Sequence, residues 1–349
     1  MNYKKPFYQV PSVIYGNNIV ERLIELLPQH TKSILIIYDK VLNINFEFLF
    51  KDYEVNIESF DATKNEPYTT DVDKLALKYE KYKIDVIIGV GGGSTMDVAK
   101  AVSVLIPVID NYLSEDFQGW DLVNHDPIYK IGIPTIAGSG SEASRTAVLN
   151  NGEKKQGINS YASMFNGIIL DNSLTKTVNS EVAFYSAMDC YIHSVESLEG
   201  NFINALSKEY ALLGLKISES RYYKMEKDAN MTLASYFGGV SIVNSEVGIC
   251  HALSYGLSIE YGIRHGLANC LIFSHLEEFY GKHVVRFKEM LKLNKISLSQ
   301  NICFDLNNDR IKRLIKTTYL MINPLINALG ENYKSILTPE KIVDIYKKI

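Results

Sequence analysis

The sequence has no long hydrophobic run. No stretch reaches the roughly 18 apolar residues that a membrane-spanning helix needs, and the N-terminal segment MNYKKPFYQVPSVIYG lacks the apolar core of a signal peptide. Hydrophobic residues still make up 46% of the chain, which is enough to bury a large core. We therefore expect a globular protein of the cytoplasm with no membrane partner.

Basic clusters and cysteines are scarce as well. The formal net charge is -4 and no run of Lys or Arg stands out, so we expect no nucleic-acid partner, because such binding depends on cations that neutralise phosphates. The chain has four cysteines with no C-x-x-C pair, at Cys190, Cys250, Cys270 and Cys303. Their spacing argues against a disulfide framework or a zinc knuckle and indicates free thiols.

What the sequence does contain is a change of period along its 349 residues. The first part alternates short apolar runs with amphipathic stretches, which is typical of βαβ units and a parallel sheet. Ligands of such a doubly wound sheet bind at the carboxyl ends of its strands. Buried strands are predicted at SILIIYD, YEVNIESFD, IDVIIGVGGGS, IYKIGIPT and NGIILD.

After about residue 175 the long stretches carry helical periodicity and few strand signals. We therefore predict two domains. Residues 1–175 form an α/β domain with a doubly wound, Rossmann-like parallel sheet that binds a dinucleotide. Residues 176–349 form an all-helical domain.

A glycine loop follows the third predicted strand. In IIGVGGGSTMDVAKAV, Gly91, Gly92, Gly93 and Ser94 precede a helix that opens near Asp97. Glycines there allow the backbone to approach a pyrophosphate, and the N–H groups of a helix start favour negative charge. The loop is either a dinucleotide site or simply a tight turn between strand and helix.

Asp39 ends the first predicted strand. An acid at this place can accept hydrogen bonds from an adenosine ribose and would repel a 2′-phosphate, which favours NAD over NADP. The alternative is that Asp39 only caps the following turn. A second cluster, PTIAGSGSEASRTAV, offers Thr135 and Ser139 to a cofactor, although SEAS also fits a helix cap.

The helical half contains AMDCYIHSVESLEG, in which Asp189 and His193 lie four residues apart, on one face of a helix. Such a pair alone is usually an exposed ion pair. The second segment, GICHALSYGLSIEYGIRHGLANC, adds His251 and His265 in apolar surroundings, where an unpaired imidazole is costly to bury. One aspartate and three histidines make a mononuclear site for Fe(II), Zn(II) or Mn(II).

The neighbouring polar residues receive a plainer interpretation. The remaining histidines lie in more polar segments and are predicted to be on the surface: His30, His125, His275 and His283. Glu196 and Glu199 are predicted to lie on a solvated face, and Glu196 could at most orient His193.

Together these segments resemble the iron-containing (group III) alcohol dehydrogenases, relatives of dehydroquinate synthase. GVGGGSTMDVAKAV is similar to the family's pyrophosphate loop, IPTIAGSGSEASRTAV to its second cofactor segment, and AMDCYIHSVES with CHALSYGLSIEYGIRHGLAN to its metal-binding helices. The resemblance implies a dehydroquinate synthase-like fold, metal ligands at Asp189, His193, His251 and His265, and a lysine near the cofactor at Lys155.

A finer resemblance points to the branch that oxidises the C8 hydroxyl of 3-deoxy-D-manno-octulosonate (Kdo) to an aldehyde. It rests on FQGWDLVNHDPIYKIGIPTIAGSGSEASRTAVL, MDCYIHSVESLEGNFINALSKEYA and NICFDL. It implies that a pyridoxal-phosphate aminotransferase uses the aldehyde for the 8-amino sugar of lipopolysaccharide. Many family members carry a proton-transferring histidine four residues after the third ligand, whereas this chain has Tyr255, as the Kdo branch does.

The expected chemistry is oxidation of an alcohol bound to the metal, with hydride passing to a nicotinamide. An acid sugar needs a cation for its carboxylate, and Arg145 or Arg264 could supply it. Oxygen or NAD(P) could be the final electron acceptor. We expect a homodimer. The alternatives are a general NAD(P)-dependent alcohol dehydrogenase or aldehyde reductase, a lyase like dehydroquinate synthase, and a binding protein without catalysis.

Overall fold

The computed structural model describes residues 6–42, 49–62, 66–152, 155–176 and 178–349. The chain forms two compact units, Tyr8–Thr177 and Val178–Ile349, and the described residues before Tyr8 belong with the second unit. The ring of Phe7 stacks on that of Tyr210 there, with centroids 5.7 Å apart. The predicted division after residue 175 differs in this respect, because it assigned the N-terminal residues to the first domain.

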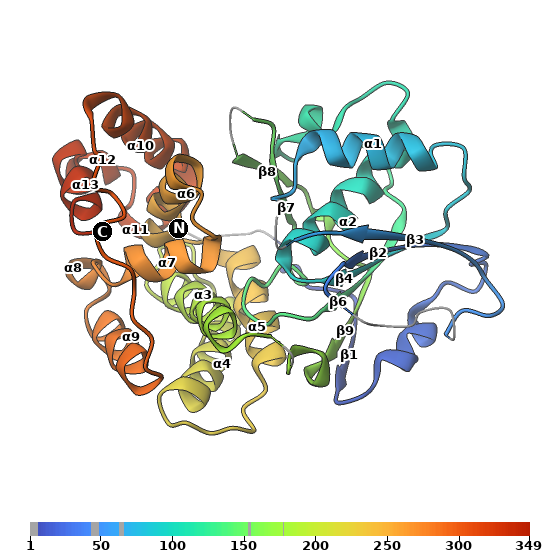
Figure 1. The fold of residues 1–349 in the computed structure, drawn as a ribbon, viewed down its shortest axis with the longest axis horizontal. Helices are drawn as coiled ribbons and strands as arrows, with labels where there is room; N and C mark the ends of the chain where they lie inside the picture. The colour runs from blue at the N-terminus through green and yellow to red at the C-terminus, as the bar shows by residue number, and fades with distance from the viewer. Residues whose placement is uncertain (1–5, 43–48, 63–65, 153–154, 177) are drawn as a thin grey trace. The chain divides into compact units, whose positions relative to one another are not determined.

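A six-stranded parallel sheet forms the centre of the first unit, in the order β1-β9-β6-β4-β2-β3 (Figure 1). All five predicted strands are present, and the edge strand β1 is an addition. The strands are β1 (Ser12–Gly16), β2 (Ser33–Asp39), β3 (Glu54–Phe60), β4 (Val86–Gly91), β6 (Tyr129–Pro134) and β9 (Gly167–Asp171).

The strand order reverses between β2 and β4. From β2 the chain adds β3 on one side, then returns to place β4 on the other side, followed by β6 and β9. In doubly wound sheets the ligand crevice lies at this point, outside the carboxyl ends of the strands. Here those ends carry Asp39 and Gly91.

Both faces of the sheet are buried. On one face, alternate residues such as Ile36 and Ile88 pack against Leu23 of η1 (Val20–Leu26). The other face packs against α2 (Gly93–Leu105), with α1 (Thr69–Tyr79) beside it. Gly89 permits the close approach of α2, because a Cβ there would lie 2.8 Å from the Cβ of Ala99. Burial on both faces explains why inner strands such as β2 and β4 contain continuous apolar runs, whereas the edge strand β3 is partly exposed.

A second, three-stranded sheet was not predicted. Its order is β5-β8-β7, with β5 parallel and β7 antiparallel to β8. These strands are short and only partly buried, so they carry little hydrophobic signal. The bounds are β5 (Gly119–Trp120), β7 (Thr146–Asn150) and β8 (Lys155–Asn159), with short helices η2 (Ile106–Val108), η3 (Ser114–Phe117), η4 (Tyr161–Ser163) and η5 (Asn172–Thr175).

Residues 178–349 contain helices and no strand, which confirms the predicted helical domain. Helix α3 packs against α4, α5 and α7, and nearly all of its second half is buried. In the described parts of the chain, no helix has both the length and the apolar character needed to cross a bilayer. The helices are α3 (Ser180–Leu198), α4 (Ala205–Tyr222), α5 (Met231–Ser245), α6 (Ile249–Tyr261), α7 (His265–Phe273), α8 (Glu277–Tyr280), α9 (Lys282–Leu293), α10 (Asn308–Leu320), α11 (Ile322–Leu329), α12 (Tyr333–Ile336) and α13 (Pro339–Tyr346).

Candidate metal centre and cofactor loop

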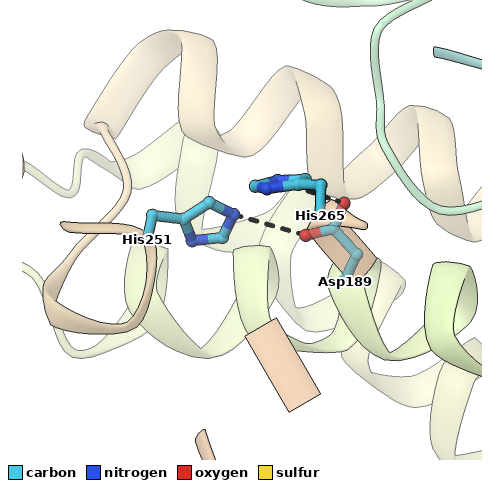
Figure 2. A group of neighbouring side chains, drawn as sticks. All are labelled: Asp189, His251 and His265. Atoms are coloured by element: carbon cyan, nitrogen blue, oxygen red, sulfur yellow. Dashed lines mark ion pairs between the residues drawn. The ribbon is translucent and has the colours of Figure 1, made fainter. Parts of the chain in front are cut away.

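Asp189 of α3 lies among three imidazoles. Its Oδ1 is 3.5 Å from Nε2 of His193, one turn further along the same helix. Nε2 of His251, in the first turn of α6, lies 3.3 Å from the same oxygen. Nε2 of His265, the first residue of α7, lies 3.8 Å from Oδ2. Three helices thus bring the four predicted ligands together, and Figure 2 shows the ion pairs that join His251 and His265 to the carboxylate of Asp189.

The donor set fits a divalent cation. Asp189, His251 and His265 offer ligand atoms that all lie within 4.8 Å of one another. Asp189, His193 and His251 are each no more than 3% exposed. One carboxylate and several imidazoles in so small a buried volume match the ligand preferences of Fe²⁺, Zn²⁺ and Mn²⁺. The helical unit therefore contains a candidate metal centre.

The pKa values of the two buried imidazoles beside the carboxylate are shifted in opposite directions. Burial disfavours the ionised form of Asp189, but the surrounding imidazoles outweigh it and hold its pKa well below the usual range. Burial lowers the pKa of His193 to about 4. Burial acts in the same direction on His251, but the carboxylates of Glu196 and Asp189 overcome it and raise that pKa to about 10.

The prediction for Glu196 is wrong. Its carboxylate is buried, 1% exposed, and Oε2 lies 2.5 Å from Nδ1 of His251 rather than next to His193. The reason is that this part of α3 has neighbouring helices on every side and no solvated face. Glu199 is exposed, as predicted, but it lies 3.3 Å from His283, which is buried instead of being on the surface.

Asn269 of α7 was not predicted at all. Its Nδ2 donates to Oδ1 of Asp189 at 2.7 Å and lies 3.2 Å from Nε2 of both His251 and His265. The residue is fully buried. The available signal was its position four residues after His265, the same spacing that relates Asp189 to His193.

Three further predicted residues lie outside the ligand set. The ring of Tyr255 stacks on that of His265, with centroids 5.8 Å apart. The guanidinium of Arg145 lies between the rings of Trp120 and Tyr161, at 4.5 and 4.6 Å from their centroids. Arg264 is exposed immediately before α7.

In the first unit, the glycine loop lies beside Asp39 at the switch point. A Cβ on Gly91 would lie 3.1 Å from the Cβ of Asp39 and 2.7 Å from Oγ1 of Thr95. A Cβ on Gly93, the first residue of α2, would lie 3.0 Å from Oγ of Ser139. The space at this helix start therefore depends on glycine, as a pyrophosphate cradle requires.

The same edge of the sheet holds the other predicted cofactor residues. Gly92 and Ser94 flank Gly93 at the start of α2, and the N–H of Thr135 donates to the carbonyl of Gly91 at 2.9 Å. Asp39 also accepts from the N–H of Val41 at 3.3 Å, so it caps the turn as well. Burial raises the pKa of its carboxyl.

Asp97 and Lys155 make strong contacts within the protein. The Asp97 carboxylate accepts from Oγ of Ser141 at 2.6 Å and from the N–H of Val148 at 3.1 Å. Lys155 lies 2.8 Å from Glu66. Sequence reasoning missed Lys100, one turn after Asp97, whose buried ammonium donates to Ser141 at 3.0 Å and holds the second cofactor segment against α2. Burial lowers its pKa to about 8.

Two family models match the chain, one over each of the two units. The family model described as iron-containing alcohol dehydrogenase matches residues 11–172. The model for the C-terminal part of the Fe-containing alcohol dehydrogenase family matches residues 183–319. Together the two models match most of the chain.

Curated relatives include an alcohol dehydrogenase of Thermococcus barophilus, 28% identical over 66% of this chain and 63% of that protein. A sulfoacetaldehyde reductase of Bilophila wadsworthia is 32% identical over 58% of this chain and 54% of that protein. A probable alcohol dehydrogenase of Escherichia coli, EutG, is 30% identical over 61% of this chain and 56% of that protein. The chain thus matches less than two thirds of the length of the first of these relatives.

Solved structures match over nearly the full length. The iron-containing alcohol dehydrogenase of Thermotoga maritima has a TM-score of 0.80 at 26% identity and covers 98% of both chains. A sulfoacetaldehyde reductase of Bifidobacterium kashiwanohense, solved with NAD⁺, has a TM-score of 0.77 at 19% identity over 98% of this chain and 97% of that chain. The fold of both units is therefore that of these proteins.

Proposed function

Because this chain belongs to the iron-containing alcohol dehydrogenase family, we propose that it interconverts a primary alcohol and its aldehyde with a divalent metal ion and NAD. The observation that carries the proposal is the buried group of Asp189, His251 and His265, with ligand atoms within 4.8 Å of one another. Burying a carboxylate among imidazoles is costly unless a cation or hydrogen bonds compensate it. A substrate oxygen can then share the cation.

Asp189, His193, His251 and His265 would hold the ion, with Fe²⁺ or Zn²⁺ as the first candidates and Mn²⁺ as the third. When bound, it would act as a Lewis acid on the substrate oxygen. The contribution of the protein is to orient the ligands. The amide of Asn269 donates to Oδ1 of Asp189 at 2.7 Å, a hydrogen bond that an ion at this oxygen would replace.

The proposed cofactor site is the edge formed by Asp39, Gly91, Gly92, Gly93 and Ser94. When bound there, NAD would accept the hydride from the alcohol carbon. The start of α2 supplies N–H groups to its phosphates, and the Asp39 carboxylate suits a ribose diol better than a 2′-phosphate. Thr135, Ser139, Asp97 and Lys155 stay candidates for further contacts.

We assign proton transfer to Tyr255. Its ring lies against the ring of His265, with centroids 5.8 Å apart, so the phenol belongs to the surroundings of the metal ligands. A phenol is a weak base near neutral pH, and a nearby cation would lower its pKa. The phenolate oxygen would take the proton that the alcohol releases during oxidation and become the neutral hydroxyl.

As the specific substrate we propose Kdo, oxidised at C8 and passed to a pyridoxal-phosphate aminotransferase. Tyr255, shared with that branch, and the motifs quoted above support this choice. So does Arg145, whose guanidinium lies between two aromatic rings and forms no ion pair with a described residue. A guanidinium held in this way is preorganised for a carboxylate. The sulfoacetaldehyde reductase among the relatives also acts, by its name, on an anionic aldehyde.

A general NAD-linked alcohol dehydrogenase or aldehyde reductase is the second candidate. To separate the two, the protein is loaded with Fe²⁺, Zn²⁺ or Mn²⁺ and offered Kdo, 2-hydroxyethanesulfonate and simple primary alcohols. NADH and peroxide are measured in parallel, which identifies the electron acceptor. Turnover of Kdo alone supports the specific proposal, and turnover of simple alcohols supports the general one.

Two variants serve as controls for this assay. Asp189→Asn removes the charged metal ligand and should abolish both activity and bound metal. Arg145→Met should raise the KM for Kdo and leave the KM of a neutral alcohol unchanged. An Arg145→Met enzyme with wild-type KM for Kdo would remove this residue from the site. Gel filtration of the same samples tests the expected homodimer.

A further inference from the structure

The carboxylate of Glu196 connects the metal centre to the start of a helix. It projects from α3 and is 1% exposed. Oε2 lies 2.5 Å from Nδ1 of His251. Oε1 accepts hydrogen bonds from the N–H of Cys250 at 2.6 Å and from the hydroxyl of Tyr280 at 3.0 Å. One buried carboxylate therefore binds both the first turn of α6 and the imidazole that this turn carries.

The start of α6 is shaped to receive the carboxylate. The free N–H groups of a helix start carry partial positive charge, which favours an acid. The hydroxyl of Tyr280 accepts from the N–H of Ile249 at 3.1 Å, so side chains satisfy the first two amides of α6. The absence of a side chain at Gly248 provides the space for this arrangement. A Cβ there would lie 2.6 Å from the Tyr280 hydroxyl and 3.0 Å from Oε1 of Glu196. A larger residue at 248 would displace the carboxylate.

This contact decides which nitrogen of His251 can bind a cation. A carboxylate only accepts hydrogen bonds, so Nδ1 of His251 carries the hydrogen between them. Nε2 is then the ring atom that gives up its hydrogen when a metal binds, and it faces Asp189, 3.3 Å from Oδ1. His193 differs, because its buried Nδ1 makes no hydrogen bond with any described residue. The tautomer of His251 is thus fixed from outside the ligand set.

On the basis of the proposed metal site, we propose that Glu196 is a positioning residue that holds His251 with Nε2 toward Asp189 and thereby sets the metal affinity. The same carboxylate fixes the start of α6, so ligand and helix cannot shift separately. Partners of this kind typically change metal affinity about 10- to 100-fold when they are replaced.

Glu196→Gln in the full-length protein tests the proposal. In the wild-type protein the backbone N–H of Cys250 and the ring Nδ1–H of His251 each have their own carboxylate oxygen. Glutamine has a single acceptor oxygen, so it can serve only one of these two positions. We expect the Kd for Zn²⁺ to rise about 10- to 100-fold. The measurement is competition with a chromogenic chelator at constant pH, without substrate or NAD, so it does not depend on activity.

Tyr280→Phe is the matched control. It removes the hydroxyl that contacts Oε1 and Ile249, but it leaves the contact between Oε2 and His251. We expect a lower melting temperature of the metal-free protein with unchanged Zn²⁺ affinity. A Glu196→Gln protein that binds Zn²⁺ as tightly as wild type overturns the positioning role. A wild-type protein that binds no Zn²⁺ or Fe²⁺ contradicts the proposed metal site itself.

If Glu196→Gln does not fold, the wild-type protein still gives the answer. In the Zn²⁺-loaded protein with nitrogen-labelled histidine, NMR should show His251 protonated at Nδ1 and metal-bound at Nε2. The signals of His251 are assigned by their loss in His251→Gln. Metal bound through Nδ1 of His251 would overturn the inference.

Discussion

The amide nitrogen of Asn269 lies 2.7 Å from Oδ1 of Asp189. It is also 3.2 Å from Nε2 of His251 and of His265, in the middle of the proposed ligand set. The nitrogen, not the oxygen, must point this way, because an amide oxygen would face the carboxylate oxygen. The N–H donors of Asn269 and a cation therefore compete for the same lone pairs.

Replacing Asn269 with alanine should destabilise the metal-free protein more than the metal-loaded one. Without metal, the buried carboxylate of Asp189 loses its neutral donor, at a cost of about 1–3 kcal/mol. With metal, the ion binds the same lone pairs and offsets most of that loss. Thermal unfolding with and without Zn²⁺ should show a larger metal-dependent increase in Tm for the variant than for wild type.

Asn327 provides a control for this experiment. It is also a fully buried amide of the helical unit, but its Oδ1 accepts from the N–H of Phe202 at 2.8 Å, and its Nδ2 donates to the carbonyl of Val247. Asn327→Ala should lower Tm equally in both states. If Asn269→Ala behaves in the same way, its amide does not compete with the metal.

Tyr255→Phe should separate proton transfer from metal binding. The aromatic ring that stacks on His265 is retained and only the hydroxyl is lost. Because positioned acid–base groups contribute roughly 100-fold or more to rate, we expect kcat to fall by about that factor. Metal content should stay at the wild-type level. A variant with wild-type kcat would show that solvent takes the proton.

Asp39→Asn distinguishes a ribose ligand from a simple turn cap. The amide oxygen can still accept from the N–H of Val41, which lies 3.3 Å from Oδ1 in the wild-type protein. If the carboxylate also binds the ribose, the KM for NAD⁺ should rise about tenfold and NADP⁺ should become a better cofactor, because the repulsion of its 2′-phosphate is removed. An unchanged preference between NAD⁺ and NADP⁺ would mean that Asp39 only caps the turn and does not bind the ribose.

The sequence predicted most of the strands of the central sheet and the change to helical periodicity in the second unit. In strands such as Ser33–Asp39 the central residues 34–37 are all apolar because both faces of the sheet are covered, and the helical period distinguishes the second unit. The small sheet of β5, β7 and β8 was missed because its strands are short and half-buried. The local hydrophobic pattern of such short strands does not show which other strands they pair with.

The site shows the same limit. The spacing of Asp189 and His193 predicts that they share a helix face, since only four residues separate them. Glu196 follows His193 by three residues and lies on the same helix, yet the imidazole that it contacts belongs to His251, 55 residues away in the sequence. Its role depends on which helix covers α3, and the sequence of α3 alone does not contain that information. Asn269 could be placed on the same helix face as His265 from its spacing, but not beside Asp189, which is 80 residues away.

Lys130 on β6 should make the stability of the protein depend on pH. It is 2% exposed, and Nζ donates to the carbonyl of Ala162 at 3.0 Å. Burial, with a smaller effect of the Lys100 ammonium, lowers its pKa from 10.5 to about 7. Between these values the unfolded chain binds a proton that the folded protein does not, so stability rises with pH. The destabilisation is complete below about pH 7 and disappears as the pH approaches the unfolded value.

Lys130→Met removes the titrating group and keeps a long side chain in the same space. Its stability relative to wild type should be greatest near or below about pH 7, and the difference should shrink by about 2 kcal/mol from about pH 7 to about pH 9. Urea unfolding of both proteins across this range measures the difference directly, because all other titrating groups are shared. Parallel stability curves for the two proteins would mean that Lys130 keeps its charge when folded, with its ammonium stabilised by the carbonyl of Ala162.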